Sequence, residues 1–228
     1  MEDVLDVYKR PHDPRFPVVG LDEKPVQLLA DVRGPLPAGA GVVRRQDHEY
    51  KRNGTANVFC ASEPLGNWRR LAVTDRRTRV DWADFVRGLV DAPRYRRAEK
   101  IVLVQDQLNT HTPASLYEAF APAEAKRIAD KLEIHYTPKH GSWLNVAEVE
   151  LSVLGKRLKE RVGDKHKLAD ACGAFERERN RAKRGVDWRF TTDDARIKLT
   201  ALPDTESVVI QYGLARIHQE STNVILGG

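Results

Sequence analysis

The sequence lacks the features that mark exported, disulfide-bonded and membrane-spanning proteins. Its 228 residues include two cysteines, Cys60 and Cys172, which lie far apart and so provide neither a disulfide framework nor the closely spaced pairs of a zinc site. The first residues, MEDVLDVYKRPHDPRF, hold no continuous apolar stretch, and no later segment approaches the roughly 20 apolar residues of a membrane helix. These absences predict a cytoplasmic protein with no membrane partner.

An excess of one charge is also missing, because Lys and Arg total 38 while Asp and Glu total 33, a formal net charge of +5. So small an excess is compatible with a polyanionic partner such as DNA but does not require one. The chain contains no internal repeat, and its length suffices for one large domain with a sizeable core. One main domain is therefore expected.

Apolar runs of strand length occur in the first third of the chain. The first run, FPVVGL at residues 16–21, ends at Asp22. Two more, at residues 56–65 and 69–78, are separated by a Gly-Asn turn and predict an antiparallel hairpin beside the first strand. Residues 31–56 are rich in Gly, Pro and Arg, a composition that predicts a long loop.

The rest of the chain alternates between strand-like and helical patterns. Residues 100–106 (KIVLVQD) are typical of a strand that helices cover on both faces, and residues 132–138 form another strand-like run. The spacing of apolar residues predicts helices at residues 80–90, 112–131, 143–158 and 166–184. The order of three strands, helix, strand, helix, strand and helices predicts a mixed α/β sheet with helices on both faces.

Acidic residues follow two of the predicted strands. Asp22 and Asp106 each stand directly after an apolar run, and adjacent strand ends would bring both carboxylates to one edge of the sheet. Each aspartate alone could equally begin a turn or cap a helix. In the helical segment at residues 143–158, Glu148 and Glu150 both flank the apolar stripe and could be solvated charges. Helical phase alone does not select either as a third acid.

Four blocks of the sequence, LDEKPVQLL, YKRNGTANVF, VLVQDQLNTHTP and HYTPKHGSWLNVAEVELSVL, resemble those of bacterial insertion-sequence transposases with a DDE catalytic domain. The mariner-related branch is the most similar. The resemblance extends from about residue 17 to residue 199, where it ends with VDWRFTTDDARIKL. It implies a ribonuclease H-like, five-stranded mixed sheet in a catalytic domain at residues 16–200. We expect an N-terminal extension at residues 1–15 and a poorly packed tail at residues 201–228.

The resemblance also implies the site and its chemistry. It makes Asp22 the first acid, Asp106 the second and Glu148 the third, and leaves Glu150 as a neighbour. Carboxylates are the ligands that Mg²⁺ prefers, and Mn²⁺ can replace it. Two such ions about 3.5–4 Å apart would activate the attacking oxygen and stabilise the leaving 3′ oxygen, with Asp22 bridging them. The implied reaction cuts DNA at transposon ends and joins the 3′-OH ends to target DNA.

Basic and polar residues near the acids are candidates for contacts with double-stranded DNA. The PKHGSW segment precedes the third acid's helix and would direct donors and a helix N-terminus at phosphate. His111 could touch phosphate or cap the helix near Thr112, and the basic residues of the long loop could track the DNA backbone or be solvated. Trp143 fits the core better than base stacking. The predicted DNA contacts are Lys139, His140, His111, Arg44, Arg45, Lys51 and Arg52.

Some features depart from the resemblance. Relatives carry an N-terminal helix-turn-helix region that recognises transposon ends, so we expect either a separate polypeptide that supplies it or a truncated copy. Gln107 stands where relatives have Asn, which bears on fine positioning more than on metal binding. A homodimer is expected in the synaptic complex. The alternatives are an inactive DNA-binding or oligomerisation remnant and a structure-selective nuclease of the same fold.

Overall fold

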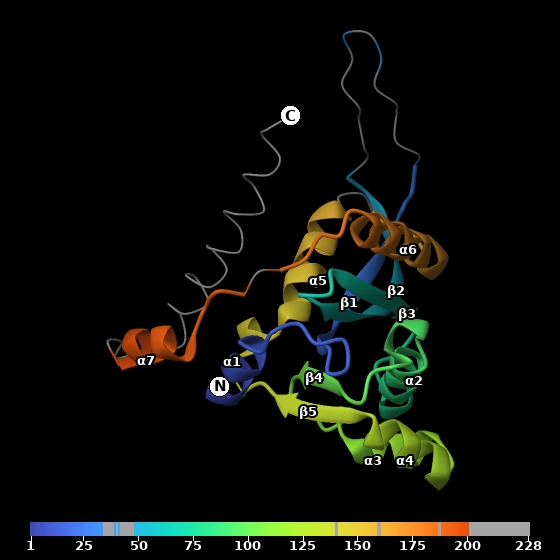
Figure 1. Cartoon of the computed structure of the whole chain (residues 1–228). Helices are drawn as coiled ribbons and strands as arrows, with labels where there is room; N and C mark the ends of the chain where they lie inside the picture. The colour runs from blue at the N-terminus through green and yellow to red at the C-terminus, as the bar shows by residue number, and fades with distance from the viewer. Residues whose placement is uncertain are drawn as a thin grey trace.

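Five strands form one mixed sheet in the computed structural model, which describes residues 1–33, 39, 41, 48–139, 141–158, 161–186 and 188–200. The strands are β1 (Val18–Asp31), β2 (Tyr50–Glu63), β3 (Trp68–Thr74), β4 (Ile101–Gln105) and β5 (Leu132–Tyr136), in the order β3-β2-β1-β4-β5 (Figure 1). The first three strands are antiparallel, whereas β4 and β5 run parallel to β1 and to each other. The five-stranded mixed sheet expected from the sequence is thus confirmed.

The first strand is longer than its apolar run predicts. Asp22 does not follow the strand but lies within β1, which continues to Asp31. The reason is the pairing with β2, which runs along β1 from Gly20 to Asp31, whereas the parallel pairing with β4 stops at Gly20. Asp22 therefore lies where the neighbouring strand ends. The loop predicted for residues 31–56 is likewise too long, because β2 begins at Tyr50.

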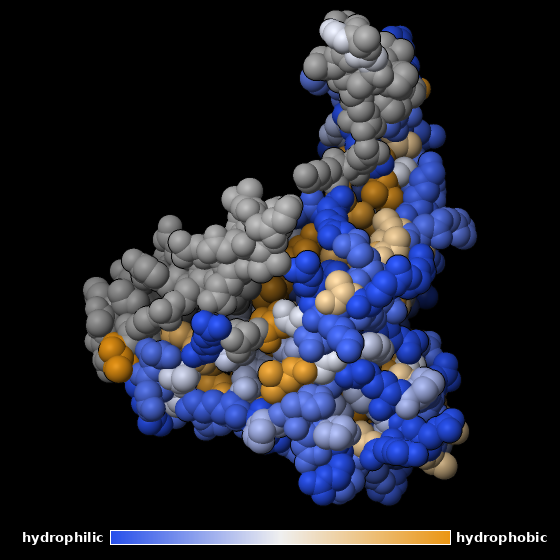
Figure 2. All heavy atoms as spheres, turned by 45° about the horizontal axis from the view of Figure 1, so that its top comes forward, coloured by the Kyte–Doolittle hydropathy of each residue, from blue (hydrophilic) through white to orange (hydrophobic). Residues whose placement is uncertain are grey.

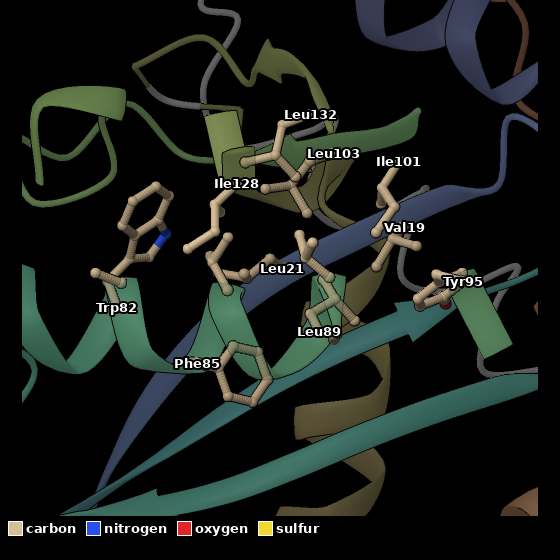
Figure 3. Close-up of a cluster of buried hydrophobic side chains, with 14 of the residues drawn as sticks. Val19, Leu21, Trp82, Phe85, Leu89, Tyr95, Ile101, Leu103, Ile128 and Leu132 are labelled. Atoms are coloured by element: carbon tan, nitrogen blue, oxygen red, sulfur yellow. The ribbon is translucent and has the colours of Figure 1, made fainter. Parts of the chain in front are cut away.

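Helices α2 (Arg79–Val90), α3 (Pro113–Ala119) and α4 (Pro122–Asp130) cover one face of the sheet. Thr78 caps α2 in a capping box with Asp81, as expected for a Thr three residues before an acid. The helix predicted at 112–131 is two helices, because Pro122 begins a new one. Large side chains of α2 and α4 pack on β1 and β4 in the core cluster that includes Val19, Leu21, Trp82, Phe85, Leu103 and Ile128 (Figure 3).

Helices α5 (Val146–Arg157) and α6 (Lys165–Arg181) cover the other face of the sheet. Leu151 and Leu154 of α5 meet Phe175 of α6 in a second core cluster with residues of β1 and β2. The helix predicted from residue 143 begins later, because Trp143 and Leu144 lie in a short 3-10 turn and Asn145 caps α5. Helices on both faces are therefore confirmed, with a corrected start for α5.

The ends of the described chain pack together beside β4 and β5. Helix α1 (Glu2–Tyr8) lies against α7 (Thr192–Thr200), and its residues Val4 and Leu5 are fully buried. The ring of Tyr8 lies 4.9 Å from that of Trp188. Trp143 packs partly buried in the same cluster, as expected for a core tryptophan. The tail predicted at residues 201–228 lies outside the described residues.

The surface in Figure 2 is largely hydrophilic, with apolar side chains gathered in separate patches among polar ones. Within the part of the chain that the structure describes, no helix has the length and apolar character needed to cross a membrane. Both cysteines are buried and free. The remaining candidates for catalytic or ligand-binding residues are the charged side chains at the edges of the sheet and on its helices.

Candidate metal centre

Three acids from three elements interact at one end of the sheet. Asp22 lies on β1, Asp106 follows the last residue of β4, and Glu148 lies in the first turn of α5. Burial, together with the negative charges of Glu148, Glu23 and Asp106, raises the pKa of Asp22 to about 7. Burial and the charge of Asp106 also raise the pKa of Glu148. The structure therefore brings the three acids within range of one another's charge, and their mutual repulsion adds to the effect of burial.

Asn145 holds the N-terminus of α5 against β1 next to Asp22. Its side-chain amide donates a hydrogen bond of 2.7 Å to the Leu21 carbonyl and accepts one of 3.1 Å from the Ala147 amide. Gly20 permits this approach, because a Cβ there would lie 3.0 Å from the Asn145 side-chain oxygen. These contacts fix where Glu148 emerges. Sequence reasoning missed Asn145, although an Asn before an apolar helical run is a common capping signal.

Glu148 and Glu150 have different partners, which helical phase could not foresee. Glu150 is fully buried and forms ion pairs with Arg69 at 3.1 Å and Arg179 at 2.7 Å. Those two arginines come from β3 and α6, on the side of α5 away from Asp106. Glu150 is thus committed to a structural ion network, whereas Glu148 interacts with the two aspartates.

His111 is buried, with a side chain only 1 % exposed, and lies between two acids. Its Nδ1 is hydrogen-bonded to Asp106, and its Nε2 lies 3.2 Å from a carboxylate oxygen of Glu23. Burial alone would lower the pKa of His111, but the hydrogen bond to Asp106 and the nearby carboxylate of Glu23 raise it to about 9. The ring does not cap the helix after Thr112. The expected phosphate contact would require the ring to leave these partners.

The donor set fits a hard divalent cation. In the described ranges, however, no three His, Cys, Asp or Glu side chains already converge as a ready cluster of ligands. Burial raises the pKa of Asp22 most, and the charges of Glu148, Glu23 and Asp106 raise it further. A divalent cation would stabilise the ionised form, and Asp22, Asp106 and Glu148 supply the oxygen ligands that such a cation prefers.

The residues predicted to contact DNA do not all lie near the three acids. Lys139 is exposed on the segment between β5 and α5, close to the acids in the chain path. Lys51 and Arg52 lie in β2 and not in a loop. Lys51 pairs with Ala30, eight residues along β1 from Asp22, or about 26 Å at the usual strand rise. His140, Arg44 and Arg45 lie outside the described residues.

Lys24 is a basic residue near the acids that the sequence reasoning did not select. It lies two residues after Asp22 on β1 and is exposed. Its positive charge lowers the pKa of Glu148 against the effect of burial. A Cβ at Gly155 would lie 3.4 Å from the Lys24 ammonium, so the glycine leaves room for it beside α5. The block LDEKPVQLL contained this signal, since the lysine alternates with the aspartate on one face of a strand.

Residues 17–169, which include all three acids, match the model of a protein family described as DDE superfamily endonuclease. The chain belongs to this family. No curated protein matches it. Among solved structures, this DDE domain is similar to the Mos1 mariner paired end complex with Mn, with 14 % identity and a TM-score of 0.38 over 82 % of this chain and 61 % of that one. It is similar to the Mos1 strand transfer complex, with 14 % identity and a TM-score of 0.39 over 82 % and 60 %.

The DDE domain thus spans about three fifths of the length of these Mos1 chains. Such distant similarity adds no argument about the site, and the assignment to the family rests on the match over residues 17–169.

Proposed function

We propose that this DDE domain is the catalytic domain of a transposase, which cuts DNA at transposon ends and joins the 3′-OH ends to target DNA. The observation that carries the proposal is the meeting of Asp22, Asp106 and Glu148 at one end of the sheet, where burial and repulsion raise the pKa of Asp22 to about 7. A divalent cation would offset the negative charge of these three neighbouring carboxylates. The description of the family as an endonuclease supports phosphodiester bonds as the class of substrate.

The cofactor in this proposal is a pair of Mg²⁺ ions, with Mn²⁺ as a substitute. When bound, such a pair supplies activation of the attacking oxygen and stabilisation of the leaving 3′ oxygen. Asp22 interacts with both other acids and is the residue best placed to bridge the ions. Asp106 and Glu148 would each complete one ion's shell. Lys24 and Lys139 would hold DNA phosphates by charge, since both are exposed and Lys24 is close enough to Glu148 to lower its pKa.

The partners follow from the reaction. Double-stranded DNA is the substrate both as transposon end and as target. Two ends must be processed together, so a homodimer that supplies one set of acids per end is the simplest assembly. The matched family region, residues 17–169, contains the acids and is the part of the chain that we assign to chemistry.

The test is a joining assay with Mn²⁺, precleaved DNA ends taken from the sequences that flank the coding region, and a supercoiled target. Wild type should join the 3′-OH ends to the target. Asp22→Asn, Asp106→Asn and Glu148→Gln should each give no product. Glu178→Gln is the matched control, because Glu178 is an exposed acid of α6 paired with Arg157 at the C-terminal end of α5, away from Glu148. This variant should join normally.

A structure-selective nuclease is the second candidate, and the family's description as an endonuclease favours it. Cleavage that depends on the three acids without any joining would support the nuclease and contradict the transposase. Binding of DNA with neither cleavage nor joining, and with no effect of Asp22→Asn on divalent-cation binding, would identify an inactive remnant. The three outcomes separate the three functions.

A further inference from the structure

A buried side chain, His111, connects the strand that carries Asp22 to Asp106, and we call the contacts from Glu23 through His111 to Asp106 the bridge. Glu23 directly follows Asp22 on β1, and its side chain is 3 % exposed. His111 lies between Glu23 and Asp106, with Nε2 3.2 Å from Glu23 and Nδ1 hydrogen-bonded to Asp106. Arg77 adds a longer contact of 3.8 Å to the other oxygen of Glu23. One imidazole thus joins β1 to the segment that follows β4.

The imidazole is held in place from several sides. Its ring stacks on Trp82 with a centroid separation of 6.0 Å. The His111 carbonyl accepts hydrogen bonds from the Gln105 side chain at 2.9 Å and from the Tyr136 hydroxyl at 3.1 Å. Gln105 in turn accepts a hydrogen bond of 3.1 Å from the Trp82 indole. The ring therefore has little freedom to move relative to β4 and α2.

The bridge acts on one side of Asp106 only. The His111 ring and the Leu108 amide both bond to Oδ1 of Asp106, and among the described residues none donates a hydrogen bond to Oδ2. The side chain of Asp106 is still 33 % exposed. A carboxylate held through one oxygen and open at the other is oriented for a ligand, because hydrogen bonds to ligating groups fix their direction.

We propose that His111 and Glu23 are positioning residues, which fix the Asp106 carboxylate relative to Asp22 so that both are oriented for divalent cations before these bind. The proposal rests on the proposed function, in which Asp22 and Asp106 are metal ligands. Asp22 and Glu23 are adjacent and face opposite sides of β1. The same strand segment therefore carries one proposed ligand, Asp22, and the residue that holds His111 against the other, Asp106. Loss of the bridge lowers cation affinity.

A second buried carboxylate in the same sheet provides a matched control. Glu63, at the end of β2, is 2 % exposed and accepts hydrogen bonds from the Tyr95 hydroxyl at 2.9 Å and from Arg94 at 2.5 Å. It also lies 3.5 Å from His12. Glu63 thus resembles Glu23 in burial and in having a histidine partner, but no proposed ligand touches it.

The experiment measures Mn²⁺ binding to the full chain by titration calorimetry, with thermal unfolding of each metal-free variant in parallel. His111→Phe keeps a ring on Trp82 but removes both nitrogens, and Glu23→Gln keeps the shape of the anchor and removes its charge. Each should weaken Mn²⁺ binding by about tenfold or more, the usual effect of removing a residue that orients a ligand. His111→Asn retains a donor near the Nδ1 position and should recover part of the affinity.

Glu63→Gln should lower the unfolding temperature as Glu23→Gln does, yet bind Mn²⁺ like wild type. Mn²⁺ affinity within twofold of wild type in both His111→Phe and Glu23→Gln would overturn the proposal, and so would an equal loss in Glu63→Gln. Should His111→Phe fail to fold, Glu23→Gln and His111→Asn carry the same comparison. Absence of Mn²⁺ binding in wild type, or unchanged binding in Asp22→Asn, would overturn the metal site itself and the bridge with it.

Discussion

Two glutamates that are neighbours on one helix have opposite electrostatic surroundings. Glu150 is fully buried but faces Arg69 and Arg179, so its charge is compensated. Glu148, two residues earlier, is near Asp106 and Asp22, and positive charge near it comes from Lys24. The paired charge of Glu150 links α5 to β3 and α6, whereas the group of acids around Glu148 has the surroundings of a functional site. The difference separates a structural face of α5, which carries Glu150, from the face proposed to bind metal, which carries Glu148.

Removing one of the crowded acids should have the largest effect on activity and the reverse effect on stability. Asp22→Asn should abolish joining, because the residue proposed to bridge the two ions is lost. The same change should stabilise the metal-free protein by on the order of 2–4 kcal/mol at pH 8, since it removes a buried charge whose pKa rises by about three units. Activity assays and urea denaturation without divalent cations test the two effects. An inactive but less stable variant would contradict the proposed repulsion.

The same acid predicts a pH dependence with a definite sign. The pKa of Asp22 rises from an ordinary 3.8 to about 7 on folding, so between these values the folded protein holds more protons than the unfolded chain. Its free energy of unfolding should therefore fall as pH rises through that window. The stability difference between Asp22→Asn and wild type should grow up to about pH 7 and then level off. A difference that is independent of pH would show that Asp22 ionises freely.

The compensated cluster should respond in the opposite way. Glu150→Gln leaves Arg69 buried without its main partner and should cost about 3–5 kcal/mol of stability. At a temperature where the variant remains folded, its Mn²⁺ affinity should equal that of wild type. Denaturation and calorimetry measure both quantities. Loss of Mn²⁺ binding in a folded Glu150→Gln protein would mean that the ion network of Glu150 and the proposed metal site depend on each other.

The sequence alone did not predict the different surroundings of Glu148 and Glu150. Apolar runs predicted the five strands and the two helical layers, because periodicity reports directly on burial. The surroundings of Glu150 depend on Arg69, 81 residues away in the chain. The position of His111, in the segment after β4, depends on Glu23 of β1. Local spacing carries no information about such contacts. The choice of Glu148 came from resemblance to a family and not from helical phase.

Two of the errors in element boundaries have the same origin. β1 extends past Asp22 because its ladder with β2 continues to Asp31, although residues 23–31 do not form an apolar run. α5 begins after Trp143 and Leu144 because Asn145 bonds to the Leu21 carbonyl, 124 residues earlier in the chain. In both places pairing with a distant segment outweighs local pattern.

Asn145 offers a smaller test of how α5 is placed. Asn145→Ala removes the cap and the bond to β1, and should cost about 1–2 kcal/mol of stability. It should also reduce the rate of joining, because Glu148 emerges from the helix turn that Asn145 fixes. Asp164→Ala is the matched control, since Asp164 caps α6 through the Lys167 amide. It should lose similar stability and keep full activity, and equal activity in the two variants would remove Asn145 from the site.

The smallest effect is expected at Lys24, the positive charge beside the crowded acids. If Lys24 meets phosphate, Lys24→Gln should weaken DNA binding uniformly across sequences and reduce the salt dependence of binding by about one unit of slope. The pKa of Glu148 should also rise, because the charge that lowers it is gone. Lys126→Gln is the matched control, as Lys126 is exposed on α4 and paired with Asp130. An identical salt slope in wild type and both variants would leave Lys24 as a local partner of Glu148 and assign the phosphate contacts to other residues.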